Sequence, residues 1–368
     1  MRARAVVVRA RDGAAALEDI DVEAPHTGEV LVRVVASGVC GSDLHVVHGR
    51  SVLDAFPMVL GHEGAGVIEA VGEGVTTVQP GDHVVLALYG PCHQCASCRA
   101  GRFVLCDGPP RVAAIAGRMA DGSSRLRLGR EPVYPMVGIG SLAERAVLRA
   151  EQVVKVDPAL PLDLICLAGC GVTTGLGSVF NVADVQPGES VAVVGCGGVG
   201  LNVVQGARIA GATTIVALDE NPRKLALAEH FGATHALTPG DEGLVDAIHR
   251  VVPGGVDVAF EVVGRPELVA QAFAATCAGG RCVMVGSPPA GAAIPIDGRA
   301  LFGERRLLGT TGGSNVPERD IARIMRLYAA GDLDLDTLRS TTHPLDEFEL
   351  AIAETERGEV ARSVVVIS

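Results

Sequence analysis

Four cysteines crowded into one short segment place the tightest constraint on how this chain can fold. They follow the spacing C-x2-C-x2-C-x7-C within PCHQCASCRAGRFVLC and are Cys92, Cys95, Cys98 and Cys106. Four thiolates this close in sequence satisfy a tetrahedral Zn²⁺ and leave it no open position, which is the pattern of a structural site. Disulfides or a chance grouping are the alternatives. The segment predicts a loop closed around one zinc ion, with His93 a solvated residue within it.

Bulk composition narrows the class of protein that carries this loop. The chain has 368 residues, of which 48% are hydrophobic, 20% charged and 3% aromatic, and this predicts a folded protein of two domains. The formal net charge is −12, so nucleic acid and anionic membranes are unfavourable partners. A DNA-binding zinc module is disfavoured by that charge and by the lack of a basic helix after the cysteines.

Neither membrane insertion nor export is predicted. No uncharged apolar run reaches ~18 residues, and the N-terminal MRARAVVVRARDG holds only three consecutive valines before Arg9, too few for a secretory signal. We expect a cytoplasmic protein. Its ten cysteines would stay reduced there, and clustered thiols would bind metal rather than pair.

The pattern of apolar residues changes along the chain. Up to about residue 150, β-type runs at 29–35, 64–71 and 83–88 are separated by Gly and Pro without long helical periodicity, which predicts an all-β lobe. From Ser190, the runs SVAVVG, TTIVAL, VDVAFE and RCVMVG alternate with helical stretches such as 201–210 and 222–231. Strands that alternate with helices predict an α/β fold with a doubly wound parallel sheet.

The remaining segments are less regular. The Gly/Ala/Pro-rich stretch 286–300 is expected to be a loop after a strand. The C-terminal part of the chain no longer alternates regularly: it is predicted to hold a helix over 317–330 and a closing strand over 363–367. We expect this tail to rejoin the first lobe.

A second set of metal-ligand residues is dispersed: Cys40 in SGVCGSD, His62 in GHEGAG and Cys170 in AGCGVTTG. Each lies beside glycines that allow the backbone to turn tightly. Taken singly, each is more often a buried core residue than a ligand. Together, two thiolates and one imidazole leave a fourth position free, as in a catalytic zinc site.

A glycine-rich turn follows the strand SVAVV and opens a helix. Its glycines are Gly195, Gly197 and Gly200, and Asp219 ends the next strand. A G-x-G-x-x-G alone is a weak signal, and the alternative is a tight turn without a ligand, but this context is the one that dinucleotide binding requires. Asp219 suits a ribose diol. Glu220 adds negative charge that disfavours a 2′-phosphate, so NAD is expected rather than NADP.

Taken together, these segments resemble the zinc-containing alcohol dehydrogenase family of the medium-chain dehydrogenase/reductase superfamily. GHEGAGVIEAVGEGV is similar to that family's signature, and the four-cysteine loop, GCGVTTG and GCGGVG follow at matching intervals over essentially the whole chain. The resemblance implies a GroES-like, β-rich catalytic domain over 1–171, completed by 313–368, and a Rossmann NAD-binding domain over 172–312. It also implies two zinc ions per chain, one catalytic and one structural.

The resemblance also assigns roles to single residues. Cys40, His62 and Cys170 would hold the catalytic zinc, with Glu63 close behind it and Asp43 orienting His62. Ser42 and His45 match the family's proton relay. The cofactor-binding positions implied are Thr174 near the nicotinamide, Arg362 near the pyrophosphate, Lys224 near the adenosine ribose, Asp219, and the turn residues Gly195, Gly197, Gly198, Val199 and Gly200. For Lys224 a plain surface charge is the alternative.

Other positions are less specific. Leu88, Met136 and Val137 fall where the family lines its substrate pocket, although any of them could be core. His48, outside the motif, is expected to be a loop residue. The long stretch between Cys106 and Gly138 resembles the dimeric branch of the family, so we expect a homodimer that pairs through the strand near 306–310.

Two departures from the family pattern affect cofactor and substrate. Gly41 stands where many relatives carry Arg or His, which removes one expected pyrophosphate contact. DGPPR after Cys106 lacks the basic position that glutathione-dependent formaldehyde dehydrogenases use. A glutathione adduct is therefore disfavoured as substrate, whereas a mycothiol adduct stays open.

The expected activity is zinc-dependent hydride transfer between an alcohol and NAD, giving an aldehyde or ketone. A thiol-adduct (mycothiol-type) formaldehyde dehydrogenase and a polyol dehydrogenase are the alternatives within this chemistry. A non-catalytic descendant of the fold is the alternative outside it. Such a descendant should have lost a zinc ligand or a relay residue, and none is missing here.

Overall fold

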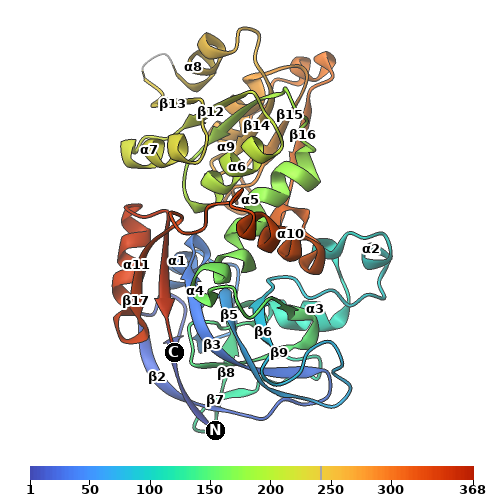
Figure 1. Ribbon diagram of the computed structural model, residues 1–368, viewed down its shortest axis with the longest axis vertical. Helices are drawn as coiled ribbons and strands as arrows, with labels where there is room; N and C mark the ends of the chain where they lie inside the picture. Colours follow the sequence, from blue (N-terminus) through green and yellow to red (C-terminus); the bar gives the residue numbers. More distant parts are fainter. Residues whose placement is uncertain (241–242) are drawn as a thin grey trace. The chain divides into compact units, whose positions relative to one another are not determined.

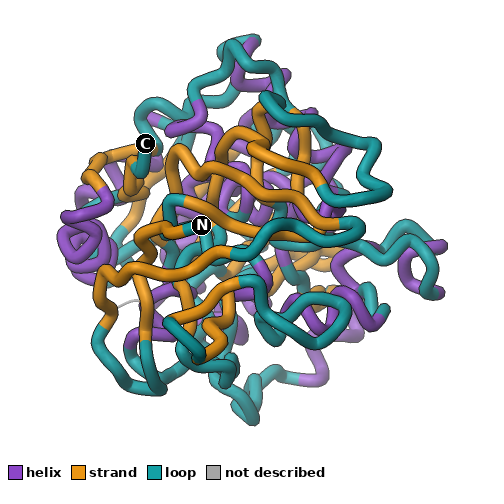
Figure 2. The backbone as a smooth tube through the Cα atoms, turned by 90° about the horizontal axis from the view of Figure 1, so that it is seen from below, coloured by secondary structure: helices purple, strands orange, loops and turns teal. Residues whose placement is uncertain are grey.

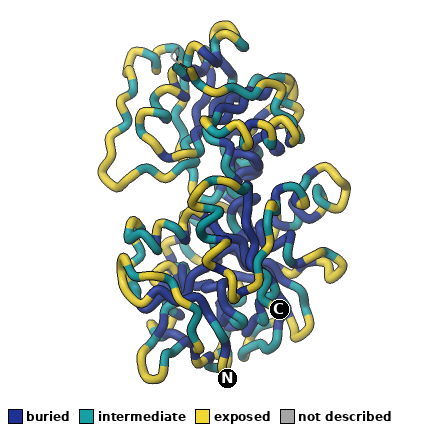
Figure 3. Tube along the Cα trace, turned by 90° about the vertical axis from the view of Figure 1, so that its left-hand side faces the viewer, coloured by how far each residue is buried: buried dark blue, intermediate teal, exposed yellow. Residues whose placement is uncertain are grey.

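The computed structural model describes residues 1–240 and 243–368, and these divide into two compact units (Figure 1). Unit 1 consists of Met1–Cys170 and Val316–Ser368, and unit 2 of Gly171–Asn315. Domain bounds of 1–171 with 313–368, and of 172–312, were expected from the sequence. In both units, buried stretches alternate with exposed loops along the trace (Figure 3).

Unit 1 is built mainly from strands, which surround the N-terminus in Figure 2. A small closed barrel has the order β1 (Arg2–Val8), β2 (Ala15–Val22), β7 (Leu126–Leu128), β8 (Glu131–Pro135) and β4 (Met58–Val59). A second sheet has the order β10 (Val153–Lys155), β6 (His83–Leu86), β5 (Glu63–Val71), β3 (Glu29–Val39), β18 (Arg362–Val366) and β17 (Arg339–Pro344), with β9 (Arg145–Arg149) also paired to β3. The C-terminal strand β18 thus lies beside β3, antiparallel, with Ser363 opposite Val39.

The expectation of an all-β lobe before residue 150 is wrong in one respect, because short helices interrupt the strands. The helices of unit 1 are α1 (Gly41–Val47), α2 (Ala96–Arg99), α3 (Pro109–Ile115), α4 (Leu162–Ile165), α10 (Pro317–Ala329) and α11 (Phe348–Arg357). Those before residue 150 have four to seven residues, too few to show a helical period. Local signals set their starts instead: α3 begins with two prolines, whose fixed φ suits a first turn.

Unit 2 is a six-stranded sheet in which every pair is parallel. Its order is β13 (His235–Leu237), β12 (Thr214–Leu218), β11 (Ser190–Val194), β14 (Val256–Glu261), β15 (Thr276–Met284) and β16 (Arg306–Gly309). Helix α5 (Gly171–Gly177) precedes the first strand, and the helices between the strands are α6 (Gly198–Ile209), α7 (Pro222–His230), α8 (Gly243–Val251) and α9 (Pro266–Ala274). This order runs outward both ways from β11, as in dinucleotide-binding folds, and the expected α/β class is confirmed.

The order in which strands are added to the sheet reverses between β11 and β14, which run parallel and have their carboxyl ends side by side at Val194 and Glu261. Ligands bind parallel α/β sheets at this kind of edge. The strands are short, continuously apolar runs, and their buried side chains form the core of this unit, for example Ala192, Val216 and Phe260. The stretch 286–300 is irregular and ends in the 3-10 turn Gly298–Gly303.

No single helix among the described residues is long and apolar enough to cross a membrane. One bent pair, Leu162–Gly169 with Gly171–Ala183, would pass by length and composition alone. Its apolar side chains are largely buried inside the fold, as expected for core helices.

Candidate metal centres and active site

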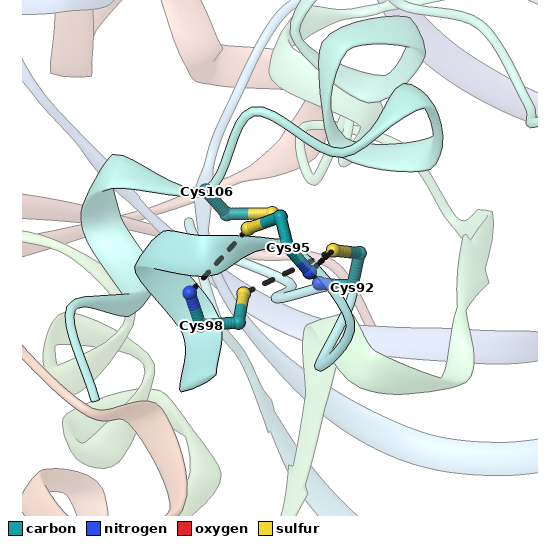
Figure 4. Close-up of side chains that lie close together, drawn as sticks. All are labelled: Cys92, Cys95, Cys98 and Cys106. Atoms are coloured by element: carbon teal, nitrogen blue, oxygen red, sulfur yellow. Dashed lines mark hydrogen bonds between the residues drawn. The ribbon is translucent and has the colours of Figure 1, made fainter. Parts of the chain in front are cut away.

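The four cysteines Cys92, Cys95, Cys98 and Cys106 converge in the loop around α2 (Figure 4). Their sulfur atoms all lie within 4.8 Å of one another. Backbone N–H groups point at the sulfurs: the N–H of Cys98 donates to Cys95 Sγ, that of Cys95 to Cys92 Sγ, and that of Cys92 to Cys106 Sγ, each at 3.4 Å. Donors of this kind stabilise thiolates, so the loop is arranged for negative sulfur.

The chemistry of these thiols fits a cation at their centre. N–H donors from Gln94 and Cys95 lower the pKa of Cys92 to about 6. Burial, reinforced by neighbouring thiols, raises the pKa of Cys98 to about 12. Sulfurs so close cannot all ionise without a bound positive charge, and four thiolates are a closed zinc set. No disulfide joins any of the ten cysteines, all of which lie in the described part of the chain.

Arg111 on α3 braces this loop. Its Nη1 donates to the carbonyl of Cys106 at 3.2 Å and its Nη2 to that of Val104 at 3.0 Å, while the guanidinium lies 5.0 Å from the ring centre of Tyr89. The basic side chain that follows the last cysteine is therefore committed to the loop itself. His93 is exposed, and its ring packs edge-on against Phe103.

A second metal-ligating group lies inside unit 1. Ligand atoms of Cys40, His62, Glu63 and Cys170 all lie within 4.8 Å of one another. Cys40 follows β3, and His62 and Glu63 sit at the start of β5, its neighbour in the sheet. Gly38 pairs with Glu63 across these strands, which places the ends carrying the ligands side by side. Cys170 enters from the turn after α4.

Asp43 contacts members of this group from the side away from the ligand atoms. Its carboxylate is fully buried and accepts the N–H of Cys40 and the N–H of Gly61, each at 2.9 Å. One oxygen lies 3.6 Å from His62 Nδ1. Burial alone would lower the pKa of His62, but the carboxylate of Asp43 and the sulfur of Cys40 raise it well above its usual range. With Nδ1 facing Asp43, Nε2 is the ring nitrogen available to a metal.

The two thiols of this group differ in their readiness to ionise. A hydrogen bond from Cys170 lowers the pKa of Cys40, while that hydrogen bond to Cys40 and burial raise the pKa of Cys170. Both can be thiolates only beside a cation. Two thiolates and one imidazole fit a zinc ion that keeps a position open for a substrate oxygen.

The glycine turn of unit 2 has the geometry of a phosphate-binding turn. Gly195 has a φ of 96°, and a Cβ on Gly200 would lie 1.9 Å from the carbonyl oxygen of Gly195, so neither tolerates a side chain. Gly197 is the N-cap of α6, and Gly198, Val199 and Gly200 form its first turn. The backbone thus presents the N–H groups of a helix start at the carboxyl edge of the sheet.

A cavity of about 240 Å³ opens beside this turn, within unit 2. Asp219, Glu220 and Lys224 line it on one side. The carboxylate of Asp219 accepts the N–H of Cys196 at 2.8 Å and that of Asn221 at 2.9 Å, which fixes it at the cavity wall. The predicted cofactor residues of β12 and α7 therefore meet in one cavity.

Comparison with known proteins shows the family of this chain. Residues 26–158 match the family model described as "Alcohol dehydrogenase GroES-like domain", and residues 198–330 match "Zinc-binding dehydrogenase". The S-(hydroxymethyl)glutathione dehydrogenase of Escherichia coli O1:K1 is 38% identical over 99% of this chain and 100% of its own length. The chain belongs to the zinc-containing alcohol dehydrogenase family.

Solved structures support the same conclusion. An alcohol dehydrogenase zinc-binding domain protein from Burkholderia ambifaria superposes with a TM-score of 0.94 at 38% identity, covering 100% of this chain and 99% of that one. Benzyl alcohol dehydrogenase from Acinetobacter calcoaceticus gives 0.93 at 33% identity, with full coverage of both chains. This protein is therefore a zinc-dependent oxidoreductase of that family, with NAD or NADP as its cofactor.

In this dehydrogenase, the predicted relay residues Ser42 and His45 lie three apart on α1 and are both exposed, whereas Asp43 between them is buried. Residues three apart lie on neighbouring parts of a helix surface. The relay role itself stays a prediction. His48, further along the chain, has its Nε2 2.8 Å from Glu356 Oε1 on α11.

Arg362, the predicted pyrophosphate contact, lies next to Glu63. Its side chain is buried, and its Nη2 is 3.5 Å from Oε1 of Glu63, behind the metal-ligating group. Burial raises the pKa of Glu63 to about 7, although the charge of Arg362 opposes that rise. The pyrophosphate contact of Arg362 stays a prediction. Thr174, the other predicted contact, lies half-buried on α5.

The three substrate-pocket candidates lie in or against the core of unit 1. Met136 is buried, and Leu88 and Val137 are partly buried against apolar clusters. Val137 has a φ of 47°, which is unusual for a β-branched residue. Their role in the substrate pocket stays a prediction. A cavity of about 270 Å³ beside the zinc loop contains His93 but none of these three.

The far wall of the unit 2 cavity was not predicted from the sequence; the loop after β14 supplies it through Val263 and Arg265. The signal was present, because topology puts the carboxyl end of the fourth strand of a doubly wound sheet beside the first. The segment EVVGR, which begins with the last residue of β14, lies at that edge.

Proposed function

We propose that this protein transfers hydride between an alcohol and NAD, giving an aldehyde or a ketone. The observation that carries this is the buried group of Cys40, His62 and Cys170, whose donor set leaves one metal position for a substrate oxygen. The unit 2 cavity beside the glycine turn would hold the adenosine part of the NAD that accepts the hydride.

Zinc held by Cys40, His62 and Cys170 would supply Lewis-acid activation of the alcohol oxygen. Asp43 holds the ligands in place, since it fixes the backbone at Cys40 and Gly61 and faces the ring of His62. The hydroxyl of Ser42 would accept the alcohol's proton as it gives up its own, which passes on toward the imidazole of His45, and His45 would release a proton to solvent. Each step reverses, so reduction of the carbonyl uses the same residues.

NAD is proposed over NADP because Asp219 and Glu220 line the adenosine cavity. A 2′-phosphate would lie against both carboxylates. Lys224 and Arg265 line the same cavity, so the preference depends on the acidic pair being closer to the ribose than these cations. Asp219→Ser should weaken NAD binding about tenfold, as for one lost hydrogen bond to a charged group. It should also reduce the difference between the affinities for NAD and NADP. Equal wild-type efficiency with both cofactors would refute this proposal.

For the substrate, we propose a small alcohol rather than a glutathione adduct. Arg111, the basic residue after the last zinc-loop cysteine, is committed to backbone carbonyls and to Tyr89. A specific observation favours the thiol-adduct alternative, since curated relatives at 38% identity are named S-(hydroxymethyl)glutathione dehydrogenase. The relative named benzyl alcohol dehydrogenase favours an aromatic alcohol.

A screen of NAD reduction distinguishes these substrates. The panel should include primary, secondary, aromatic and polyol alcohols, together with the hydroxymethyl adducts of glutathione and mycothiol. We expect the highest kcat/KM with a simple or aromatic alcohol. Preference for either thiol adduct by tenfold or more would replace this assignment, and no reduction of NAD or NADP by any compound would refute the enzyme function.

We also propose a homodimer that pairs through β16. This strand ends the sheet order of unit 2 and so leaves one edge without a strand partner in the described chain. Beside it, Leu301 and Phe302 are 50% and 91% exposed, which is unusual for large apolar side chains away from an interface. Light scattering should give twice the chain mass. A monomer or a tetramer would contradict the proposal.

A further inference from the structure

A buried carboxylate lies directly beneath the far wall of the unit 2 cavity. Glu261 is the last residue of β14 and is fully buried. Its Oε1 accepts the N–H of Gly264 at 2.8 Å, that of Val263 at 3.0 Å and that of Arg265 at 3.4 Å. One oxygen atom thus gathers three consecutive N–H groups of the loop that connects β14 to α9.

The same loop forms part of the cavity. Val263 and Arg265 line it, and Leu268 follows from the first turn of α9. Val263 also packs on the phosphate-binding turn, because a Cβ on Gly195 would lie 2.6 Å from its Cγ2. A shift of this loop would therefore move the cavity wall and the first glycine of the turn together.

The backbone of Glu261 is held independently of its side chain. Its carbonyl accepts the N–H of Val285 at 2.8 Å and that of Gly286 at 3.0 Å, while the next residue, Val262, donates to the carbonyl of Val194. The strand end is thus fixed to both neighbouring strands. Gly264 packs closely against Gly286 and Ser287, and the carboxylate of Glu261 adds the hydrogen bonds that join this fixed point to the loop at residues 263–265.

We propose that Glu261 is a positioning residue for the cofactor: its Oε1 holds the loop 263–265 in the shape that closes the adenosine cavity. This inference rests on the NAD site proposed above and concerns a residue that touches no part of that cavity itself. Val263 is 49% exposed, so it offers an apolar surface that the adenine ring would cover.

The loop needs an acceptor atom at one place and not a negative charge. Burial raises the pKa of Glu261 against the opposing effect of the three N–H donors. Oε2 has no hydrogen-bond partner among the described residues. An uncharged side chain of equal length that keeps one acceptor oxygen should therefore serve as well.

Two variants separate acceptor from charge. Glu261→Gln keeps the length and one acceptor oxygen, while Glu261→Asp keeps the charge but is one methylene too short to reach the loop. Glu189, whose carboxylate pairs with Arg281 at 2.7 Å near the opposite end of β11, supplies a control in the same unit. Glu189→Gln should lower the thermal stability slightly without altering cofactor affinity.

Calorimetric titration with ADP-ribose and NAD measures the effect without turnover. We expect Glu261→Asp to weaken both ligands about tenfold or more, to leave kcat at saturating NAD within about threefold, and to leave zinc content unchanged. Glu261→Gln should bind within about threefold of wild type. Hydrogen exchange of a peptide over 262–268 should be faster only in Glu261→Asp.

Other results would overturn the inference in distinct ways. Wild-type affinity in Glu261→Asp would show that the carboxylate does not hold the cavity. Equal losses in Glu261→Asp and Glu261→Gln would show that one acceptor oxygen at this place is not what holds the loop. If Glu189→Gln weakened ADP-ribose and NAD binding as much as Glu261→Asp does, the loss of affinity would come from general destabilisation of the unit. If wild-type protein bound neither ADP-ribose nor NAD, the proposed cofactor itself would fail, which is a separate outcome.

Discussion

The two cysteine-containing sites of unit 1 are built in opposite ways. The zinc loop takes all four ligands from Cys92–Cys106, and two of its sulfurs are partly exposed. The other group takes Cys40, His62 and Cys170 from distant parts of the chain and holds the first two in the core. A local site organises the loop that contains it. A dispersed site forms only after the surrounding sheet exists.

This difference separates stability from chemistry. A closed set of four thiolates leaves no room for a substrate, so its metal contributes to folding free energy. The dispersed group is supported by Asp43, Glu63 and the strands around them. We therefore expect its metal to contribute little to the shape of those strands and its open position to serve the reaction.

The largest expected effect is on turnover. Cys170→Ser removes one thiolate from the dispersed group and should lower kcat roughly a thousandfold or more. The melting temperature should stay within about 3 °C of wild type, because the turn after α4 remains packed. Steady-state kinetics, zinc content and thermal melting test this. A variant that keeps more than a tenth of the activity would place the reaction elsewhere.

The counterpart is Cys98→Ser in the zinc loop. Loss of one ligand from the closed set should release one zinc ion and lower the melting temperature by at least about 5 °C. Wild-type protein purified without chelator should contain two zinc ions per chain, and this variant one. Specific activity just after purification in the cold should stay within about threefold of wild type. An unchanged melting temperature would contradict the structural role.

His45→Gln tests the solvent side of the dispersed group. Alcohol oxidation should fall about tenfold below pH 8, because an imidazole accepts protons near neutral pH and an amide does not. Imidazole or small amine buffers should partly restore the rate, while zinc content and NAD affinity stay the same. His48→Gln, which alters the histidine near Glu356 on the same segment, is the matched control. An unaltered pH–rate profile would remove His45 from the relay.

The smallest expected effect concerns the brace on the zinc loop. Arg111→Ala loses two hydrogen bonds to loop carbonyls and should lower the free energy of unfolding by about 1 kcal/mol. Zinc release to a colorimetric chelator should be faster. Arg118→Ala removes a similar contact on Tyr134 away from the cysteines and should leave the release rate unchanged. A large rise in KM for a thiol adduct in Arg111→Ala would instead place Arg111 in the substrate site.

Sequence patterns predicted most elements whose signal is local. The strand and helix around GCGGVG are β11 and α6, and the closing strand at 363–367 corresponds to β18. The helices α1 and α2 were not predicted, because each is shorter than two turns and starts directly after a ligand cysteine. Such helices depend on capping and on the site itself rather than on an apolar period.

The site residues divide in the same way. Spacing alone indicated the zinc loop. Cys40, His62 and Cys170 could be grouped only by ligand type and neighbouring glycines, with their role implied by the family resemblance, and the structure brings them together. The position of Arg362 beside Glu63 had no signal in the sequence, since it depends on β18 pairing with β3. Glu261 was equally hidden, because a carboxylate at a strand end is recognisable only by the N–H groups it accepts.

The insertion of β18 between β3 and β17 has a consequence for synthesis of the protein. Cys170 leaves the ribosome about 190 residues before Arg362, which is roughly 10–40 s at ordinary elongation rates. During that interval, β3 lacks its partner over Ala36–Val39 and Glu63 lacks its arginine. The N-terminal segment must therefore wait with an open strand edge, a state prone to association with other chains, until the last few residues are translated and close it.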